Sequence, residues 1–208
     1  QSKIYESKKK NKLDAFKSDG IGIYFRYKAD FCNMISGIQN IPIEGKFAIF
    51  MGYFQLFLAK ELSQIIADLL DGINMDLNSF YVKIGEMLSV QIESLNEIPE
   101  FIIKRIESLD EMINLSFYEE DWDSVLSFAK VYGNFFTKYV KALQAVDGLK
   151  LMRFNVLIDE YENASMFQSC INTLIKQTSD DIPISYRIGM RPRGMENNYT
   201  LVAYEKLQ

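Results

Sequence analysis

The sequence contains no histidine, and this absence excludes several classes of enzyme. Without an imidazole there is no Ser-His-Asp or Cys-His nucleophilic site and no zinc site with histidine ligands. Cysteine is almost as scarce, since Cys32 and Cys170 are the only two. Two cysteines cannot form a four-cysteine metal site, and so low a count favours buried thiols in a reducing cytosol. Any chemistry must therefore use carboxylates, lysine, arginine, hydroxyl groups or a bound metal.

The sequence also lacks an excess of basic charge and a long apolar run. Its 208 residues include 23 Lys and Arg against 28 Asp and Glu, so charge does not support a DNA-binding face, although DNA contact stays possible. The most apolar window, residues 47–59, is too short to cross a bilayer and contains Gln55. Residues 1–12 show no signal-peptide pattern. We therefore expect a cytoplasmic protein without a membrane segment, built as one domain with or without an insertion.

The first third of the chain predicts the beginning of an α/β core. Residues 21–28 are rich in β-branched and aromatic side chains and follow a turn signal, which predicts a strand. Residues 47–70 repeat apolar side chains every three or four positions, which predicts a long and largely buried helix. We assign residues 1–72 to the first part of this α/β core.

The rest of the chain divides into a helical part and a second α/β part. Residues 73–148 carry aromatic stripes at helical spacing, typical of core packing, and are assigned to a helical insertion or subdomain. Residues 149–208 form the second part of the core, with a strand over 149–158, a helix over 164–177 and a strand over 184–190. This order predicts a parallel sheet with right-handed crossovers.

The segment that carries chemistry is the strand that ends in Asp159 and Glu160. Its apolar run is typical of a strand buried on both faces of a parallel sheet, and the acids follow at the edge where open α/β folds bind ligands. The first acid can hold a hydrated Mg²⁺ that bridges phosphates, and the second can orient and deprotonate a water. The alternative is a solvated turn in which Asp159 or Glu162 caps the next helix.

The next predicted strand ends at Arg191. In a parallel sheet it can lie beside the acidic strand and bring the Arg191 guanidinium to the same edge. There the guanidinium can pair with a γ-phosphate, or with an acid when the nucleotide is absent. The alternative is a surface arginine in a turn with Pro192.

The segments VLIDEYEN, INTLIK and ISYRIGMRPRG resemble the Walker B to sensor 1 region of P-loop ATPases of the AAA+/STAND class. The chain is most similar to bacterial ATPases related to the origin-recognition replication initiators, in which an early strand also ends in an arginine, as at Arg26. The similarity covers mainly residues 20–70 and 150–194.

The resemblance implies a role for each candidate site residue. It makes Asp159 the magnesium residue, Glu160 the catalytic glutamate and Arg191 the sensor arginine. It also implies ATP and Mg²⁺ as cofactors, hydrolysis that drives a conformational switch, and a protein partner or self-association. Arg26 and Arg193 are candidates for an arginine finger by location alone.

The sequence departs from this family in one important feature, because it contains no G-x-x-x-x-G-K-[ST] loop. The nearest segment, at residues 44–47, lacks the upstream glycine and the hydroxyl after Lys46. The backbone N–H cradle and the phosphate lysine are therefore missing. Since residue 1 is not methionine, we expect the loop to lie upstream in a longer protein, with a nucleotide-dead relative as the alternative. The chain alone is expected to bind ATP weakly and to be inactive.

Two other functions compete with the ATPase reading. The first is a non-catalytic helical interaction module, in which residues 76–146 bind a protein partner through a strongly acidic exposed side. The second is a metal-dependent nuclease that uses Asp159, Glu160 and Glu162.

Overall fold

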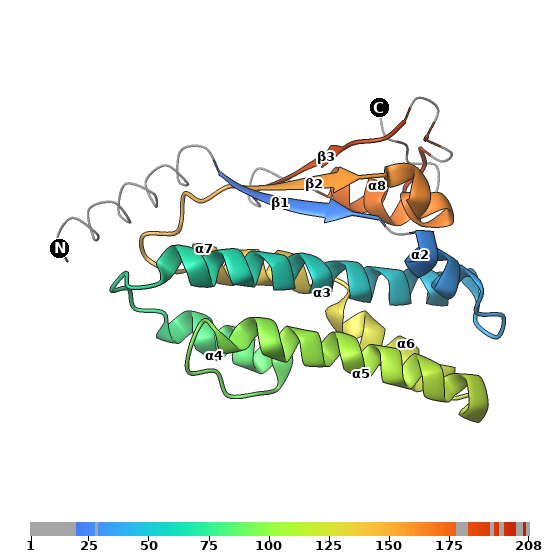
Figure 1. Cartoon of the computed structure of the whole chain (residues 1–208), viewed down its shortest axis with the longest axis horizontal. Helices are drawn as coiled ribbons and strands as arrows, with labels where there is room; N and C mark the ends of the chain where they lie inside the picture. Colours follow the sequence, from blue (N-terminus) through green and yellow to red (C-terminus); the bar gives the residue numbers. More distant parts are fainter. Residues whose placement is uncertain are drawn as a thin grey trace.

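A parallel sheet forms one layer of the molecule, as the computed structural model shows (Figure 1). The structure describes residues 20–27, 29–177, 183–191, 194–195, 198–202 and 206. The sheet consists of β1 (Ile21–Arg26), β2 (Phe154–Asp159) and β3 (Ile184–Ile188), which pair in that order. The predicted α/β class, a partial parallel-sheet core with a large helical part, is confirmed.

Helices occupy both crossover connections. Between β1 and β2 lie α2 (Ala29–Ser36), α3 (Ile43–Leu70), α4 (Asn78–Leu88), α5 (Glu97–Glu119), α6 (Trp122–Tyr132) and α7 (Phe135–Gln144). Between β2 and β3 lie the 3-10 helix η1 (Tyr161–Phe167) and α8 (Gln168–Lys176).

Several element boundaries differ from the sequence-based prediction. Residues 149–153 are not strand, because the backbone N–H groups of Leu149 and Met152 close local turns onto Val146 and Leu149. A helix, α2, stands where a loop was expected, and α3 begins four positions earlier than predicted, directly after Pro42. Proline suits a helix start because it needs no backbone N–H partner there.

The long helix α3 packs between the sheet and the other large helices (Figure 1). On the sheet side, Phe25 of β1 meets Phe54 edge-on with ring centroids 5.0 Å apart. On the other side, α3 packs against α5, α6 and α7, and the buried Gln55 accepts a 3.0 Å hydrogen bond from the backbone N–H of Phe136. Apolar packing on both sides explains why the sequence of α3 is hydrophobic almost all round.

The described helices that pack against the sheet share one of its faces. Phe167, at the end of η1, stacks on Phe50 of α3 with ring centroids 4.5 Å apart, which places α8 beside α3. The opposite face carries Tyr24, Leu157 and Arg187, all exposed in the described part of the chain. Parallel sheets are normally covered on both faces, so an open face is what a partial core would show.

The two cysteines, Cys32 and Cys170, are buried free thiols, as predicted. Burial raises the pKa of the Cys32 thiol to about 12, so it is protonated at neutral pH. Among the described helices, none combines the length and the apolar character that a membrane span requires. The proposed division at residues 72 and 148 stays a prediction, and Arg193 lies outside the described residues.

Candidate functional site

The central strand β2 places Asp159 and Glu160 at the carboxyl edge of the sheet. Arg26 of β1 is the register partner of Asp159, and Ile188 of β3 pairs with Ile158, so the three strands end together. Glu160 leaves the strand in the left-handed conformation, with φ 53° and ψ 41°, and this bend leads directly into η1. Such a conformation is costly for a residue with a side chain and occurs preferentially at functional sites.

Both carboxylate oxygens of Asp159 accept hydrogen bonds from the protein. The Tyr24 hydroxyl donates to Oδ2 at 2.7 Å, and the backbone N–H of Glu160 donates to Oδ1 at 2.9 Å. These hydrogen bonds hold the pKa of Asp159 below its usual range, and the bond from Tyr24 is the largest cause. The carboxylate is therefore ionised and fixed in orientation, and each oxygen keeps a lone pair that can accept from a metal-bound water.

The carboxylate of Glu160 is held by two side chains. Arg26 forms an ion pair with Oε1, and the Asn163 side-chain amide donates to Oε2 at 3.0 Å. Arg26 is the main cause of the lowered pKa of Glu160. A carboxylate with a lowered pKa is a weaker base, so this arrangement orients Glu160 but restrains it from accepting a proton.

Arg191 reaches the same edge through the connection that follows β3. The backbone N–H of Gly189 donates to Ile158 O at 2.6 Å, and that of Tyr161 donates to Gly189 O at 3.2 Å. Arg191 Nε lies 3.2 Å from Glu162 Oε1, and its side chain is 82% exposed. The predicted residues therefore gather at one edge, with Arg191 paired to Glu162 rather than to Asp159 or Glu160.

Two residues of this site, Tyr24 and Asn163, were not identified from the sequence, and Arg26 was named only as a candidate arginine finger. Tyr24 and Arg26 are two positions apart on β1, so their side chains share the face opposite α3. Asn163 follows Glu160 by three residues, the spacing of one turn of η1. These spacings were visible in the sequence, but only the strand register shows which acids the side chains meet.

The acids do not form a metal site by themselves. Within the ranges that the structure describes, no three Asp, Glu or Cys side chains gather closely enough to hold a metal ion. A nuclease site made of Asp159, Glu160 and Glu162 would need such a group, so the structure does not support that reading. A single carboxylate does fit Mg²⁺, which commonly binds one or two carboxylates together with waters and substrate phosphates.

Lys46, in the nearest approach to a phosphate loop, has a structural contact. Its Nζ donates to the backbone carbonyl of Ser36 at 2.5 Å and so joins the end of α2 to the first turn of α3. This contact gives Lys46 a structural role that requires no nucleotide.

Comparison with known proteins agrees with the resemblance found in the motifs. The sequence profile of a family described as ORC-CDC6-like matches residues 1–208. No curated protein and no solved structure shows a significant match to the chain. With a family match over its whole length and two acids at the end of its central strand, the chain belongs to the ORC-CDC6-like family and is related to the AAA+ ATPases.

Proposed function

We propose that this chain supplies the part of an ATP-driven switch that handles Mg²⁺ and the attacking water. The observation that carries the proposal is the gathering of Asp159, Glu160 and Arg191 at the carboxyl edge of one parallel sheet. This edge is the usual ligand-binding position of open α/β folds. Membership of the ORC-CDC6-like family supports ATP as the ligand.

Asp159 is the residue that would hold Mg²⁺, through a bound water. Its orientation is already fixed by Tyr24 and by the backbone of Glu160, so little ordering is needed when the metal binds. When bound, Mg²⁺ would supply positive charge that partly neutralises the phosphates of the nucleotide.

Glu160 would orient the attacking water and accept its proton. In this structure Arg26 holds that carboxylate and lowers its pKa. Acting as a base therefore requires Glu160 to leave Arg26, so we propose that the pair describes a resting arrangement of the site.

Arg191 would exchange its carboxylate partner for the γ-phosphate. Its side chain is 82% exposed, whereas the Glu162 side chain is only 20% exposed, so the guanidinium is the accessible half of the ion pair. Exchange of partners would couple the nucleotide to η1, which carries Glu162, and to the segment that follows β3, and this coupling would form the switch.

The proposal is tested in the longest natural polypeptide that contains this sequence. Glu160→Gln should retain nucleotide binding and lower turnover by about 100-fold or more, the usual contribution of a general base. Asp159→Ala should weaken Mg²⁺-dependent nucleotide binding itself. Glu107→Gln, a change at an exposed position of α5, is the matched control and should change neither quantity. Hydrolysis at the unaltered rate in both site variants would show that the assignment is wrong.

A second function, binding of a protein partner by the helical part, is favoured by one feature. At the junction of α5 and α6 the side chains of Leu115, Phe117 and Tyr118 are exposed, and that of Tyr118 is 89% accessible. Residues 107–123 around them contain seven Asp and Glu and no Lys or Arg. Apolar contacts within an acidic surface suit a basic protein segment, whereas DNA would be repelled.

This second function can be followed with the single tryptophan of the chain. Trp122 lies at the same junction and meets Phe117 edge-on with ring centroids 5.4 Å apart. A tryptophan-free peptide of alternating lysine and leucine should change the fluorescence of Trp122. A peptide of alternating lysine and serine should change it far less. Equal responses would indicate charge attraction alone and would contradict a specific docking surface.

A further inference from the structure

The outer edge of β1 has backbone groups without a strand partner in the described part of the chain. In a parallel pair, alternate residues direct their N–H and C=O groups away from the neighbouring strand. The backbone N–H groups of Ile21 and Tyr27 bond toward β2, at 2.7 Å and 3.1 Å. The groups of Gly22, Tyr24 and Arg26 therefore point outward, and all three residues are exposed.

This edge lacks the features that usually protect an edge strand from pairing. β1 contains no proline and no lysine, and its register with β2 runs without a bulge over the whole strand. Its one charged side chain, Arg26, is engaged by Glu160 and lies on the face opposite α3. A further strand could therefore hydrogen-bond to β1 without removing any existing backbone bond.

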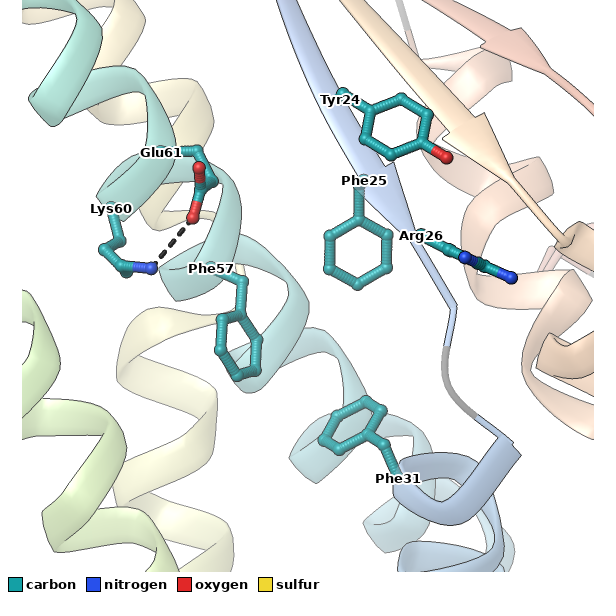
Figure 2. A pocket seen from close by; sticks show the side chains of 7 residues that line it. All are labelled: Tyr24, Phe25, Arg26, Phe31, Phe57, Lys60 and Glu61. Atoms are coloured by element: carbon teal, nitrogen blue, oxygen red, sulfur yellow. Dashed lines mark hydrogen bonds and ion pairs between the residues drawn. The ribbon is translucent and has the colours of Figure 1, made fainter.

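A cavity of about 360 Å³ opens at the same edge, between β1 and α3 (Figure 2). Its apolar lining comes from three elements, with Phe25 on β1, Phe31 on α2 and Phe57 on α3. The ring centroids of Phe25 and Phe31 lie 6.4 Å and 6.2 Å, respectively, from the ring centroid of Phe57, so the three rings form one aromatic surface. All three side chains are only partly buried.

The charges around this cavity indicate which side chain would fit it. Lys60 pairs with Glu61 at 2.8 Å, and Arg26 pairs with Glu160, so each cation in the lining already has an anionic partner. An acidic side chain would find no unpaired cation there, and a basic one would meet Lys60 and Arg26. An uncharged apolar or aromatic side chain complements the cavity best.

We propose that the outer edge of β1 receives an extended segment of a partner protein as an additional strand of the sheet, with an uncharged apolar or aromatic side chain in the cavity. In such binding the backbone hydrogen bonds supply affinity, and the pocket for alternate side chains supplies specificity. The open edge and the aromatic cavity are separate observations that point to the same occupant. The proposal does not depend on ATP binding or hydrolysis.

The probe for this proposal is a short capped peptide in which threonine and valine alternate around a central phenylalanine. Its binding to the 208-residue chain is measured by fluorescence anisotropy of a label on the peptide. We expect saturable binding in the micromolar to millimolar range typical of a short peptide. Replacing the central phenylalanine by serine, or methylating alternate backbone nitrogens, should each lower the affinity about tenfold or more.

Two variants of Gly22 separate edge pairing from other contacts. Gly22→Pro removes one outward N–H and no bond to β2, because the N–H of Gly22 points away from β2 and an edge strand tolerates proline at such a position. Gly22→Ala retains the N–H and is the matched control. The proline variant should lose affinity about tenfold while the alanine variant binds like the parent. Phe57→Gln tests the cavity, and it should weaken the phenylalanine peptide without affecting the serine peptide.

Three outcomes would overturn the proposal. The first is that the phenylalanine peptide fails to bind a folded chain at millimolar concentration. The second is that Gly22→Pro and Gly22→Ala bind the peptide equally well. The third is that light scattering finds a dimer of this chain that Gly22→Pro converts to a monomer, which would assign the edge to a second copy instead. Circular dichroism of each variant establishes that the fold is retained.

Discussion

Arg26 and Glu160 are 134 positions apart in the sequence and form an ion pair at the carboxyl edge of the sheet. The cation comes from β1, and the acid follows the end of the neighbouring strand β2. The residue proposed to activate water is thus held by β1, whose outer edge pairs with no other strand that the structure describes. Because this ion pair forms without a nucleotide, its effect on the pKa of Glu160 can be measured in the chain alone.

Arg26→Ala should raise the pKa of Glu160 toward its ordinary value of 4.5, because the largest cause of its lowering is removed. The folded-state pKa is depressed, so the contact stabilises the fold above the ordinary pKa and is lost as the pH falls through the lowered value. NMR titration of the Glu160 side-chain carboxyl carbon measures the shift. Arg187→Ala, on the same face of β3, is the control and should leave the titration unchanged. An unaltered Glu160 titration in the Arg26 variant would contradict the pairing.

Tyr24→Phe should raise the pKa of Asp159, because the hydroxyl that donates to Oδ2 is the first cause of its lowering. The ring is retained, so packing should change little. The same NMR titration, applied to Asp159, measures the effect. Tyr118→Phe removes a hydroxyl that is remote from the sheet and should have no effect. A Tyr24 variant with the parental Asp159 titration would show that the bond does not form in solution.

Gly20→Ala should lower the free energy of unfolding by about 1–2 kcal/mol, since a left-handed residue with a side chain is strained by that amount. Gly20 has φ +84°, and an added Cβ would lie 2.8 Å from Asn155 Nδ2. Gly22→Ala is the matched control, because its Cβ would meet nothing within 4 Å. Urea unfolding followed by circular dichroism compares the two variants. Equal stability would mean that the turn before β1 differs from the one described.

Phe167→Ala should lower the free energy of unfolding by about 3–5 kcal/mol, the usual range for a buried phenylalanine. The Phe167 ring is fully buried and stacks on Phe50, so its loss leaves a cavity between η1 and α3. Tyr118→Ala, at a position that is 89% exposed, should change stability by no more than about 0.5 kcal/mol. Similar midpoints of urea unfolding for the two variants would contradict this packing.

The 208-residue chain should bind ATP and Mg²⁺ more weakly than micromolar, because it contains no G-x-x-x-x-G-K-[ST] motif to surround the phosphates. Isothermal titration calorimetry with the isolated chain measures this affinity. A longer natural polypeptide with such a motif, if one contains this sequence, should bind more tightly under the same conditions. Micromolar binding by the isolated chain would show that other residues replace the missing loop.

Much of the architecture was predictable from local patterns. The apolar run before Asp159 predicted a central strand, and the helical periodicity of residues 47–70 predicted the buried helix α3. The strand predicted from residue 149 was wrong at its beginning, because turns formed by Leu149 and Met152 depend on backbone hydrogen bonds that apolar composition does not specify. The helix α2 was missed because its eight residues carry too short an apolar pattern to stand out.

The sequence by itself determined the chemistry that is available here, since the absence of histidine and the pair Asp159 and Glu160 follow from residue identity alone. Only the tertiary structure decided which side chains hold these acids, because Tyr24 and Arg26 reach them through the parallel register of β1 and β2. Among the described strands, the order β1-β2-β3 leaves the outer edge of β1 unpaired beside an aromatic cavity. Strand pairing joins segments that are distant in the sequence and depends on their packing against α3, so no local pattern in β1 specifies it.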